Sequence, residues 1–326
     1  MEQRRKFIKK VASGTTGIGL MSAFPGIITS CGPTKQKEQS AEVTSTPEEK
    51  EMFFKISLAE WSLNRSLFGG KLDNLDFPAY TKNTFGIDAV EYVNQFFKDK
   101  AEDNAYLTEL KTRTDDLGIT NVLIMIDGEG GLGLVDDTER TKAVENHYKW
   151  VEAAKFLGCH SIRVNAYGEG TAEEVKAAAI DGLGRLSEFG AQNNIGIIVE
   201  NHGGYSSNGQ WLSDVMAQVN NPICGTLPDF GNFCIKRGEG RECLEEYDKY
   251  KGVAELMPYA KGVSAKAHVF DDAGNEANMD YKKLLTTVKD AGYTGYIGIE
   301  FEGEGEEIPG INATKALLEK VGKEIS

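Results

Sequence analysis

Residues 161–202 read SIRVNAYGEGTAEEVKAAAIDGLGRLSEFGAQNNIGIIVENH, and this stretch decides the fold class of the chain. It begins with a short run rich in β-branched residues (161–165). A longer segment with apolar or small residues at helical spacing follows (172–189), and a second apolar run (195–200) ends it. A strand, a helix and another strand in this order predict two parallel strands joined by a helical crossover.

The same alternation continues along the chain in both directions. The candidate strands are residues 54–60, 87–91, 121–125, 161–165, 195–200, 224–227, 262–268 and 296–301. Several intervening segments end in a glycine before the next strand, as helix C-caps do; these glycines are Gly86, Gly118, Gly158 and Gly292. Eight strand-then-helix units predict an α/β protein with a closed (β/α)8 TIM barrel. An open doubly wound sheet is the runner-up, disfavoured because no G-x-G-x-x-G follows the first strand.

The first 52 residues have a different composition from the rest of the chain. Residues 4–10 read RRKFIKK, a twin-arginine run, and a weakly apolar stretch follows and ends in small residues before Cys31. This pattern resembles a bacterial lipoprotein signal, so residues 1–31 are predicted to be a signal and Cys31 the lipidated N-terminus. Residues 32–52 are polar and predict a flexible linker. Residues 53–326 then form one barrel domain of an exported, periplasmic or outer-membrane-anchored protein.

Charge and cysteine usage narrow the range of partners. The formal net charge is -14, and such a surface repels phosphate backbones, so nucleic acid is not an expected partner. Membrane contact is expected only through lipidated Cys31, and homo-oligomerisation is left open. The remaining cysteines show no C-x-x-C spacing; they are Cys159, Cys224, Cys234 and Cys243. We expect buried thiols, with one disulfide as the alternative in an oxidising compartment.

Polar residues end the last four candidate strands, at the barrel end where active sites form. They are Glu200, Asp229, His268 and Glu300. Carboxylates that point into one cleft repel each other unless a cation neutralises them. Three carboxylates and one imidazole therefore predict a site for one divalent ion, and this ligand set suits Mn²⁺, Mg²⁺, Co²⁺ or Zn²⁺.

Other residues on inward faces are candidates for contact with a small-molecule sugar substrate. The set comprises Trp61, Glu91, Asn94, Arg163, Asn165, His202 and Lys266. Two further histidines, His147 and His160, lie away from the catalytic end and are expected to be structural.

Four motifs carry a resemblance to a known family: IIVENHGG around Glu200, LPDFGN around Asp229, SAKAH around His268 and YIGIEFEG around Glu300. With them, residues 53–321 resemble the xylose isomerase-like TIM-barrel superfamily of sugar phosphate isomerases and epimerases. The resemblance implies that these four residues bind one divalent ion. It also implies that Glu200 and Glu300 exchange a proton with a carbon next to a carbonyl. Export and the lack of a basic cluster favour an unphosphorylated sugar.

The sequence departs from the ketose epimerases of this family after the seventh strand, where it reads VFDDAG instead of carrying their arginine. The alternative activity is therefore a 3-keto-glycoside lyase or hydratase of glycan catabolism, in which the same base drives β-elimination. The non-enzyme alternative is a lipid-anchored sugar-binding protein, which would have lost a ligand or a base. The histidine-rich trinuclear zinc site of the endonuclease IV branch does not fit a chain with 4 histidines.

Overall fold

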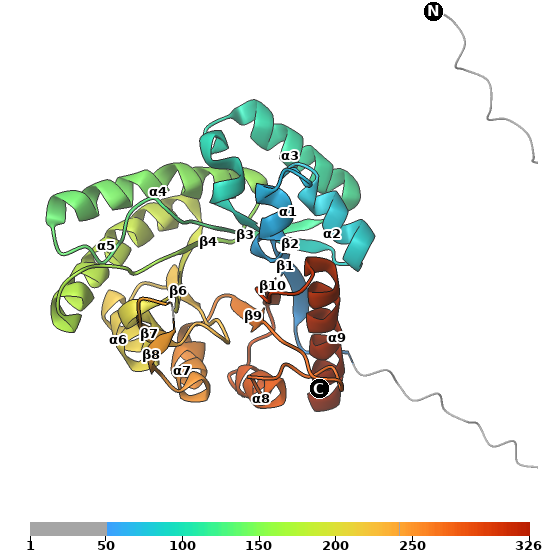
Figure 1. Ribbon diagram of the computed structural model, residues 1–326. Coiled ribbons are helices and arrows are strands. Elements are labelled where there is room, and N and C mark those ends of the chain that lie inside the picture. The colour runs from blue at the N-terminus through green and yellow to red at the C-terminus, as the bar shows by residue number, and fades with distance from the viewer. Residues whose placement is uncertain (1–50, 241) are drawn as a thin grey trace, which may run out of the picture. The chain divides into compact units, whose positions relative to one another are not determined.

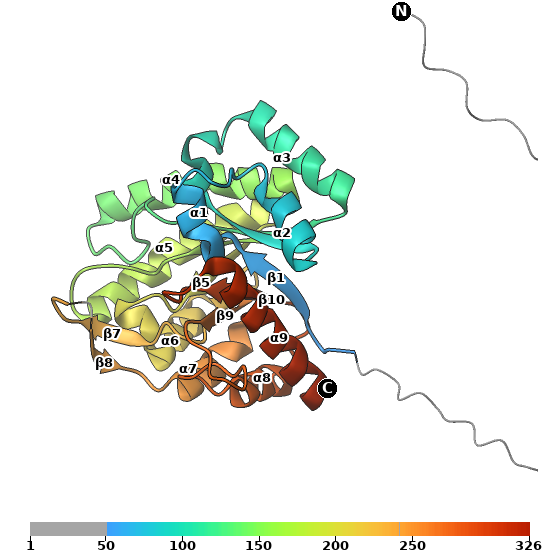
Figure 2. The same cartoon turned by 45° about the vertical axis from the view of Figure 1, so that its right-hand side comes forward.

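The computed structural model describes residues 51–240 and 242–326. Eight parallel strands form one sheet in the order β6-β5-β4-β3-β2-β1-β10-β9, with helices around them (Figures 1 and 2). The strands of this sheet are β1 Lys55–Ala59, β2 Ala89–Val93, β3 Thr120–Met125, β4 Ser161–Val164, β5 Gly196–Glu200, β6 Cys224–Leu227, β9 Val263–Ala267 and β10 Tyr296–Phe301. The α-helices are α1 Asn64–Phe68, α2 Phe77–Phe85, α3 Asn104–Leu117, α4 Asp137–Leu157, α5 Ala172–Asn193, α6 Gly209–Val219, α7 Lys249–Leu256, α8 Tyr281–Asp290 and α9 Glu307–Ile325. Short 3-10 helices are η1 Glu60–Leu63, η2 Asn94–Lys100, η3 Gly204–Ser207 and η4 Met257–Tyr259.

Backbone contacts join β6 to β9, the two ends of the sheet order. The chain that leaves β6 forms parallel bridges from Thr226 to Ala260 and from Asp229 to Ser264. The amide of Phe230 donates a hydrogen bond to the carbonyl of Ser264 at 3.1 Å. These contacts close the sheet into a (β/α)8 barrel, so the predicted TIM barrel is confirmed and the open sheet is wrong.

Helix ends follow the local sequence signals. Gly86, Gly118 and Gly158 adopt the left-handed conformation at the ends of α2, α3 and α4, as predicted for C-caps. Thr171 starts α5 with a capping box, in which Glu174 donates its amide to the threonine hydroxyl and accepts from the threonine amide. The predicted barrel strands differ from the observed ones by at most two residues at each end.

An antiparallel hairpin that the sequence pattern does not predict, β7 Cys234–Arg237 and β8 Cys243–Glu246, is inserted between β6 and α7. A disulfide joins Cys234 to Cys243 across it. The expected free thiols are therefore correct for Cys159 and Cys224, which are buried, and wrong for the hairpin pair. Four-residue strands without alternation of apolar and polar residues are difficult to predict from sequence. A hairpin this short is only marginally stable by itself, and the disulfide stabilises it.

The barrel interior has an apolar part and a polar part. Its apolar cluster includes Ala59, Val93, Leu123, Met125, Ile198 and Leu227. A larger apolar layer fills the space between strands and helices. Polar side chains from other strands occupy the carboxyl end of the interior beside Ala59, Val93, Met125 and Leu227, which are the last residues of their strands.

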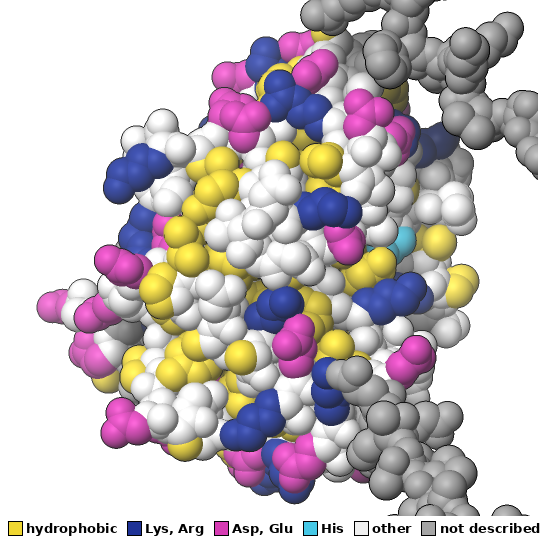
Figure 3. Space-filling model, turned by 90° about the vertical axis from the view of Figure 1, so that its right-hand side faces the viewer, with side chains coloured by type: hydrophobic (Ala, Val, Ile, Leu, Met, Phe, Trp, Pro, Cys, Tyr) yellow, Lys and Arg dark blue, Asp and Glu magenta, His cyan; other side chains and the backbone are white. Residues whose placement is uncertain are grey.

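The predicted signal, the lipidated Cys31 and nearly all of the predicted linker lie outside the described residues. Within the described part, the helices lack the combination of length and apolar character that crossing a bilayer requires. On the face shown in Figure 3, Lys and Arg side chains are interspersed with Asp and Glu. A basic patch for nucleic acid is not seen on this face.

Candidate metal centre and active site

Three buried carboxylates meet at the carboxyl end of the barrel. Glu200 ends β5, Asp229 lies two residues after β6, and Glu300 is the last residue but one of β10. One ligand oxygen from each lies within 4.8 Å of the others. Glu200 Oε2 and Asp229 Oδ2 accept no hydrogen bond in the described structure, although both atoms are buried. Each of these two oxygens has a cation nearby, Arg163 Nε at 2.9 Å from Glu200 Oε2 and Lys266 Nζ at 3.6 Å from Asp229 Oδ2. Three buried carboxylates this close together fit the ligand set of a divalent cation that prefers oxygen.

Lys266 places a positive charge inside the same cluster. Its side chain is only 1% exposed, and its Nζ lies 3.0 Å from Glu300 Oε1 and 3.6 Å from Asp229 Oδ2. Burial would lower the pKa of Lys266, but the neighbouring carboxylates outweigh it and raise this pKa well above its ordinary value. The lysine is therefore a resident cation of the cluster.

The lysine does not balance the three carboxylates by itself. Arg163 also contacts Glu200, but it is shared with Asp127. Lys266 therefore leaves two of the three negative charges of the cluster unmatched, when all are ionised. One divalent ion would match them, so metal and lysine fit the same site together.

His268 occupies the next inward position on the chain after Lys266, nearer to the solvent. It is half-buried and is not among the groups close enough to share a metal ion in the described residues. The structure thus brings together three of the four predicted ligands and leaves His268 outside that group. Alternation along β9 also directs Lys266 inward, and it is Lys266 that contacts Glu300.

A second polar network extends from Glu200 to the mouth of the barrel. Arg163 Nε lies 2.9 Å from Glu200 Oε2, and its Nη1 donates to Asp127 Oδ1 at 2.8 Å. Asn165 donates to the same Asp127 oxygen at 2.8 Å, and its own oxygen lies 3.0 Å from His202 Nδ1. His202 is exposed to solvent, as a side chain at an open mouth is.

Asp127 belongs to the site, although it was not among the predicted site residues. It lies two residues after β3, so the rule applied to the last four strands would have found it on the third. Asn94, a predicted candidate, holds it in place, donating to the Asp127 carbonyl and accepting from its amide at 2.9 and 3.0 Å. Burial would raise the pKa of Asp127, but Arg163 outweighs it and holds this pKa below its usual range.

Two further side chains orient the carboxylates. Asn232 donates to Glu200 Oε1 at 2.9 Å. Asn201 binds the backbone of Asp229 from both sides, donating to its carbonyl and accepting from its amide at 3.0 and 2.8 Å. Asp229 Oδ1 accepts from the amides of Gly231 and Asn232, so its Oδ2 is the oxygen left for a ligand.

The environment separates the pKa values of the carboxylates. Burial raises the pKa of Glu200 to about 7, with Arg163 opposing the shift and Glu300 adding to it. Burial likewise raises the pKa of Asp229 to about 7 against the effect of Lys266. For Glu300, burial would also raise the pKa, but Lys266 and a hydrogen bond from Ser264 lower it below its ordinary value. Carboxyl groups with separated pKa values are typical of an acid and a base in one site.

Two predicted substrate contacts lie apart from the cluster. Trp61 follows β1 at the mouth, where it packs edge-on against Phe68 and tilted against Phe96 at 6.0 and 6.1 Å. Its contact with substrate remains a prediction. Glu91 is buried inside the barrel, where its Oε1 accepts from Ser57 at 2.6 Å.

Gly298 makes room for Glu91, because a Cβ at this position would lie 2.5 Å from Glu91 Oε2. We expect Gly298→Ala to lower the free energy of unfolding by about 1–3 kcal/mol, since strand and carboxyl are both held in place. Urea unfolding measures the change. Gly184→Ala is the control, because a Cβ there meets nothing within 4 Å and alanine favours helix. Equal stability of the two variants would contradict this role of Gly298.

The stability of the protein should depend on pH through Glu91. Burial raises the pKa of Glu91 from 4.5 to about 8. Between these values the folded protein keeps the proton that the unfolded chain releases, so stability falls as pH rises through this window. Glu91→Gln should therefore flatten the loss of stability between pH 5 and pH 8, measured by urea unfolding at each pH. Parallel pH profiles for the two proteins would show that Glu91 is not the titrating group.

Comparisons with known proteins identify the family of this barrel. The model of the family described as xylose isomerase-like TIM barrel matches residues 81–321. A search of the curated proteins found no match. Among solved structures, the chain is similar to the IOLI protein with a bound zinc atom, at 14% identity and a TM-score of 0.64, covering 83% of this chain and 99% of that one.

Two more solved structures are similar over most of their length. One is apo 3-keto-D-glucoside 4-epimerase from E. coli, at 13% identity and a TM-score of 0.60, covering 82% of this chain and 99% of that one. The other is a sugar phosphate isomerase/epimerase from Parabacteroides distasonis, at 14% identity and a TM-score of 0.63, covering 85% of this chain and 97% of that one. At sequence identities this low, the similarity to these structures shows a shared fold alone.

Proposed function

Because the chain belongs to the xylose isomerase-like TIM barrel family, we propose that it is a sugar isomerase or epimerase that removes a proton next to a carbonyl group. The observation that carries the proposal is the pair Glu200 and Glu300. Both are buried at the carboxyl end of the barrel, and their pKa values are shifted in opposite directions. Two carboxyl groups that share one buried site can remove a proton from a carbon and return one.

Glu300 is the proposed base. Its lowered pKa keeps it ionised at neutral pH, and Ser264 and Lys266 fix the orientation of its carboxylate. Glu200, oriented by Asn232, is the proposed second group that exchanges a proton with the substrate. Arg163 and Lys266 supply positive charge for the oxygen of the substrate that becomes negative when the proton leaves.

A divalent metal ion is part of the proposal. Glu200, Asp229 and Glu300 would hold it. The closeness of their oxygens and the unmatched negative charge of the cluster support this role. When bound, such an ion polarises the carbonyl group and makes the neighbouring C–H more acidic.

The substrate is proposed to be an unphosphorylated sugar. The two buried cations of the site are engaged with carboxylates, Arg163 with Asp127 and Glu200, and Lys266 with Asp229 and Glu300. Both would have to leave these partners to bind a phosphate group. The export expected from residues 1–31 is consistent with a substrate found outside the cytoplasm.

A 3-keto-glycoside lyase is the second candidate, because proton removal next to the keto group can also expel the substituent at the anomeric carbon. The similar fold of the E. coli 3-keto-D-glucoside 4-epimerase supports keto-glycosides as a class worth testing.

The test is incubation of the metal-loaded protein with free ketoses, aldoses and 3-keto-glycosides in D₂O. An isomerase or epimerase incorporates deuterium next to the carbonyl and conserves the molecular skeleton. A lyase splits the glycoside, which mass spectrometry detects. Absence of exchange and cleavage with every sugar, despite bound metal, would favour the sugar-binding protein over both enzymes.

A further inference from the structure

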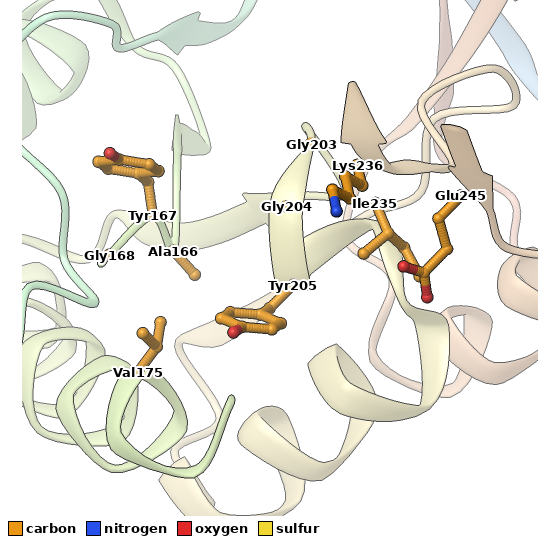
Figure 4. A pocket seen from close by; sticks show the side chains of 10 residues that line it. All are labelled: Ala166, Tyr167, Gly168, Val175, Gly203, Gly204, Tyr205, Ile235, Lys236 and Glu245. Carbon is orange, nitrogen blue, oxygen red and sulfur yellow. The ribbon is translucent and has the colours of Figure 1, made fainter. Parts of the chain in front are cut away.

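A cavity of about 300 Å³ lies beside the mouth of the barrel, outside the acid cluster (Figure 4). It is bordered by the segments that follow β4 and β5 and by the β7–β8 hairpin. Ala166 and Gly203 line it, and they directly follow Asn165 and His202, the hydrogen-bonded pair at the mouth. Consecutive Cα atoms are about 3.8 Å apart, so the cavity begins one residue away from the polar network of the site.

Two tyrosine rings border the cavity. Figure 4 shows Tyr167 and Tyr205 on opposite sides of the open space. The hydroxyl of Tyr205 donates to the carbonyl of Gly170 at 3.0 Å, and its ring stacks on Trp211 at 5.9 Å. Trp211 is itself held by a hydrogen bond to the carbonyl of Ala172. Tyr205 is thus a fixed platform. The ring of Tyr167 is 56% exposed, and its hydroxyl donates to Glu169 Oε1 at 2.9 Å.

Charged groups line the hairpin side of the cavity. Lys236 and Glu245 face each other across the β7–β8 ladder, and both line the cavity. The disulfide from Cys234 to Cys243 closes this hairpin and limits its movement. The cavity therefore combines aromatic faces with hydrogen-bonding groups on a cross-linked support.

We propose that this cavity binds a second sugar ring, linked to the ring that reacts at the acid cluster. The C–H faces of a sugar pack against aromatic rings, and its hydroxyl groups need a few placed polar partners, which Lys236 and Glu245 supply. The inference rests on the proposed function and deepens it: the substrate class is a disaccharide or larger glycoside rather than a free monosaccharide. It also gives the lyase candidate a place for its leaving sugar.

The test measures binding of glucose, maltose, cellobiose and lactose to the full chain by titration calorimetry. We expect at least one disaccharide to bind at least tenfold more tightly than glucose. Tyr205→Ala should weaken this disaccharide about tenfold and leave the affinity for glucose unchanged. Tyr205→Phe keeps the aromatic face and should bind as the native protein does, and thermal melting of each variant verifies that it is folded.

The outcomes separate this inference from the proposed reaction. Equal affinity for glucose and all three disaccharides, or an unchanged affinity in folded Tyr205→Ala, would overturn the second-ring site. Tighter binding of an aryl glucoside than of every disaccharide would also overturn it, because the cavity would then take an apolar group. Deuterium exchange on a reducing keto sugar does not involve this cavity, so its presence or absence reports on the proposed function alone.

Discussion

Glu300→Gln is expected to lower the rate of deuterium exchange next to the sugar carbonyl by about 10²- to 10⁴-fold. The amide cannot accept a proton as the carboxylate does. Glu300 is the proposed base, and it is the carboxyl group of the cluster whose pKa is lowered. The loss should appear in kcat, because the group acts on the reacting carbon. The measurement is NMR of deuterium incorporation under saturating sugar.

Glu302→Gln is the matched control for this variant. It makes the same chemical change two residues away, and the carboxylate of Glu302 also lies near Lys266, at 3.3 Å. Its side chain is 31% exposed, however, so it does not share the dry environment of the cluster. We expect this variant to lower the exchange rate by less than about tenfold, because it loses a partly exposed contact with Lys266 and not a general base. Similar rates for the two variants would remove Glu300 from the role of base.

Lys266→Met is expected to have the largest effect on stability. It removes the resident cation and leaves buried carboxylates without their nearest positive charge, at Glu300 and Asp229. Removing one partner of a buried ion pair costs about 3–5 kcal/mol. Urea unfolding in the presence of a chelator measures the loss, which we expect to be partly reversed by Mn²⁺ because the ion replaces the missing charge.

The affinity for Mn²⁺ provides the second readout, which does not depend on activity. Lys266→Met should bind the ion more tightly than the native protein, because the lysine no longer repels it. Lys282→Met is the control: this lysine pairs with Glu324 at 2.6 Å, with both side chains at least half exposed. An exposed pair contributes about 0–1 kcal/mol. A Lys266→Met protein as stable as this control, with unchanged affinity for Mn²⁺, would show that the lysine does not neutralise the cluster.

The sequence predicted the parts of the site that depend on strand periodicity. Glu200, Asp229 and Glu300 were predicted from their positions at strand ends, and the structure places them together because parallel strands bring their carboxyl ends to one edge. The same rule did not predict which of Lys266 and His268 contacts the carboxylate cluster. Lys266 on β9 and His268 just after it have the same parity along the chain. The register between β9 and β10, which the sequence does not reveal, sets Lys266 opposite Glu300.

Other features of the site come from pairings that are distant along the chain. Asp127 is held by Arg163 and Asn165, 36 and 38 residues away. The two tyrosines that line the cavity come from the segment after β4 (Tyr167) and from η3 (Tyr205), and they border one space only after the barrel closes. No local pattern of residue types predicts such contacts.

Local chemistry thus determined the eight strand-and-helix units, the glycine caps and the inward acids, because helix and strand periodicity and capping act over a few residues. The tertiary structure alone decided which inward group lies beside Glu300, how far Glu200 and Glu300 separate in pKa, and which cysteines pair. The reason is physical: charge coupling, burial and cross-linking depend on distances through space, and these are set when the barrel closes.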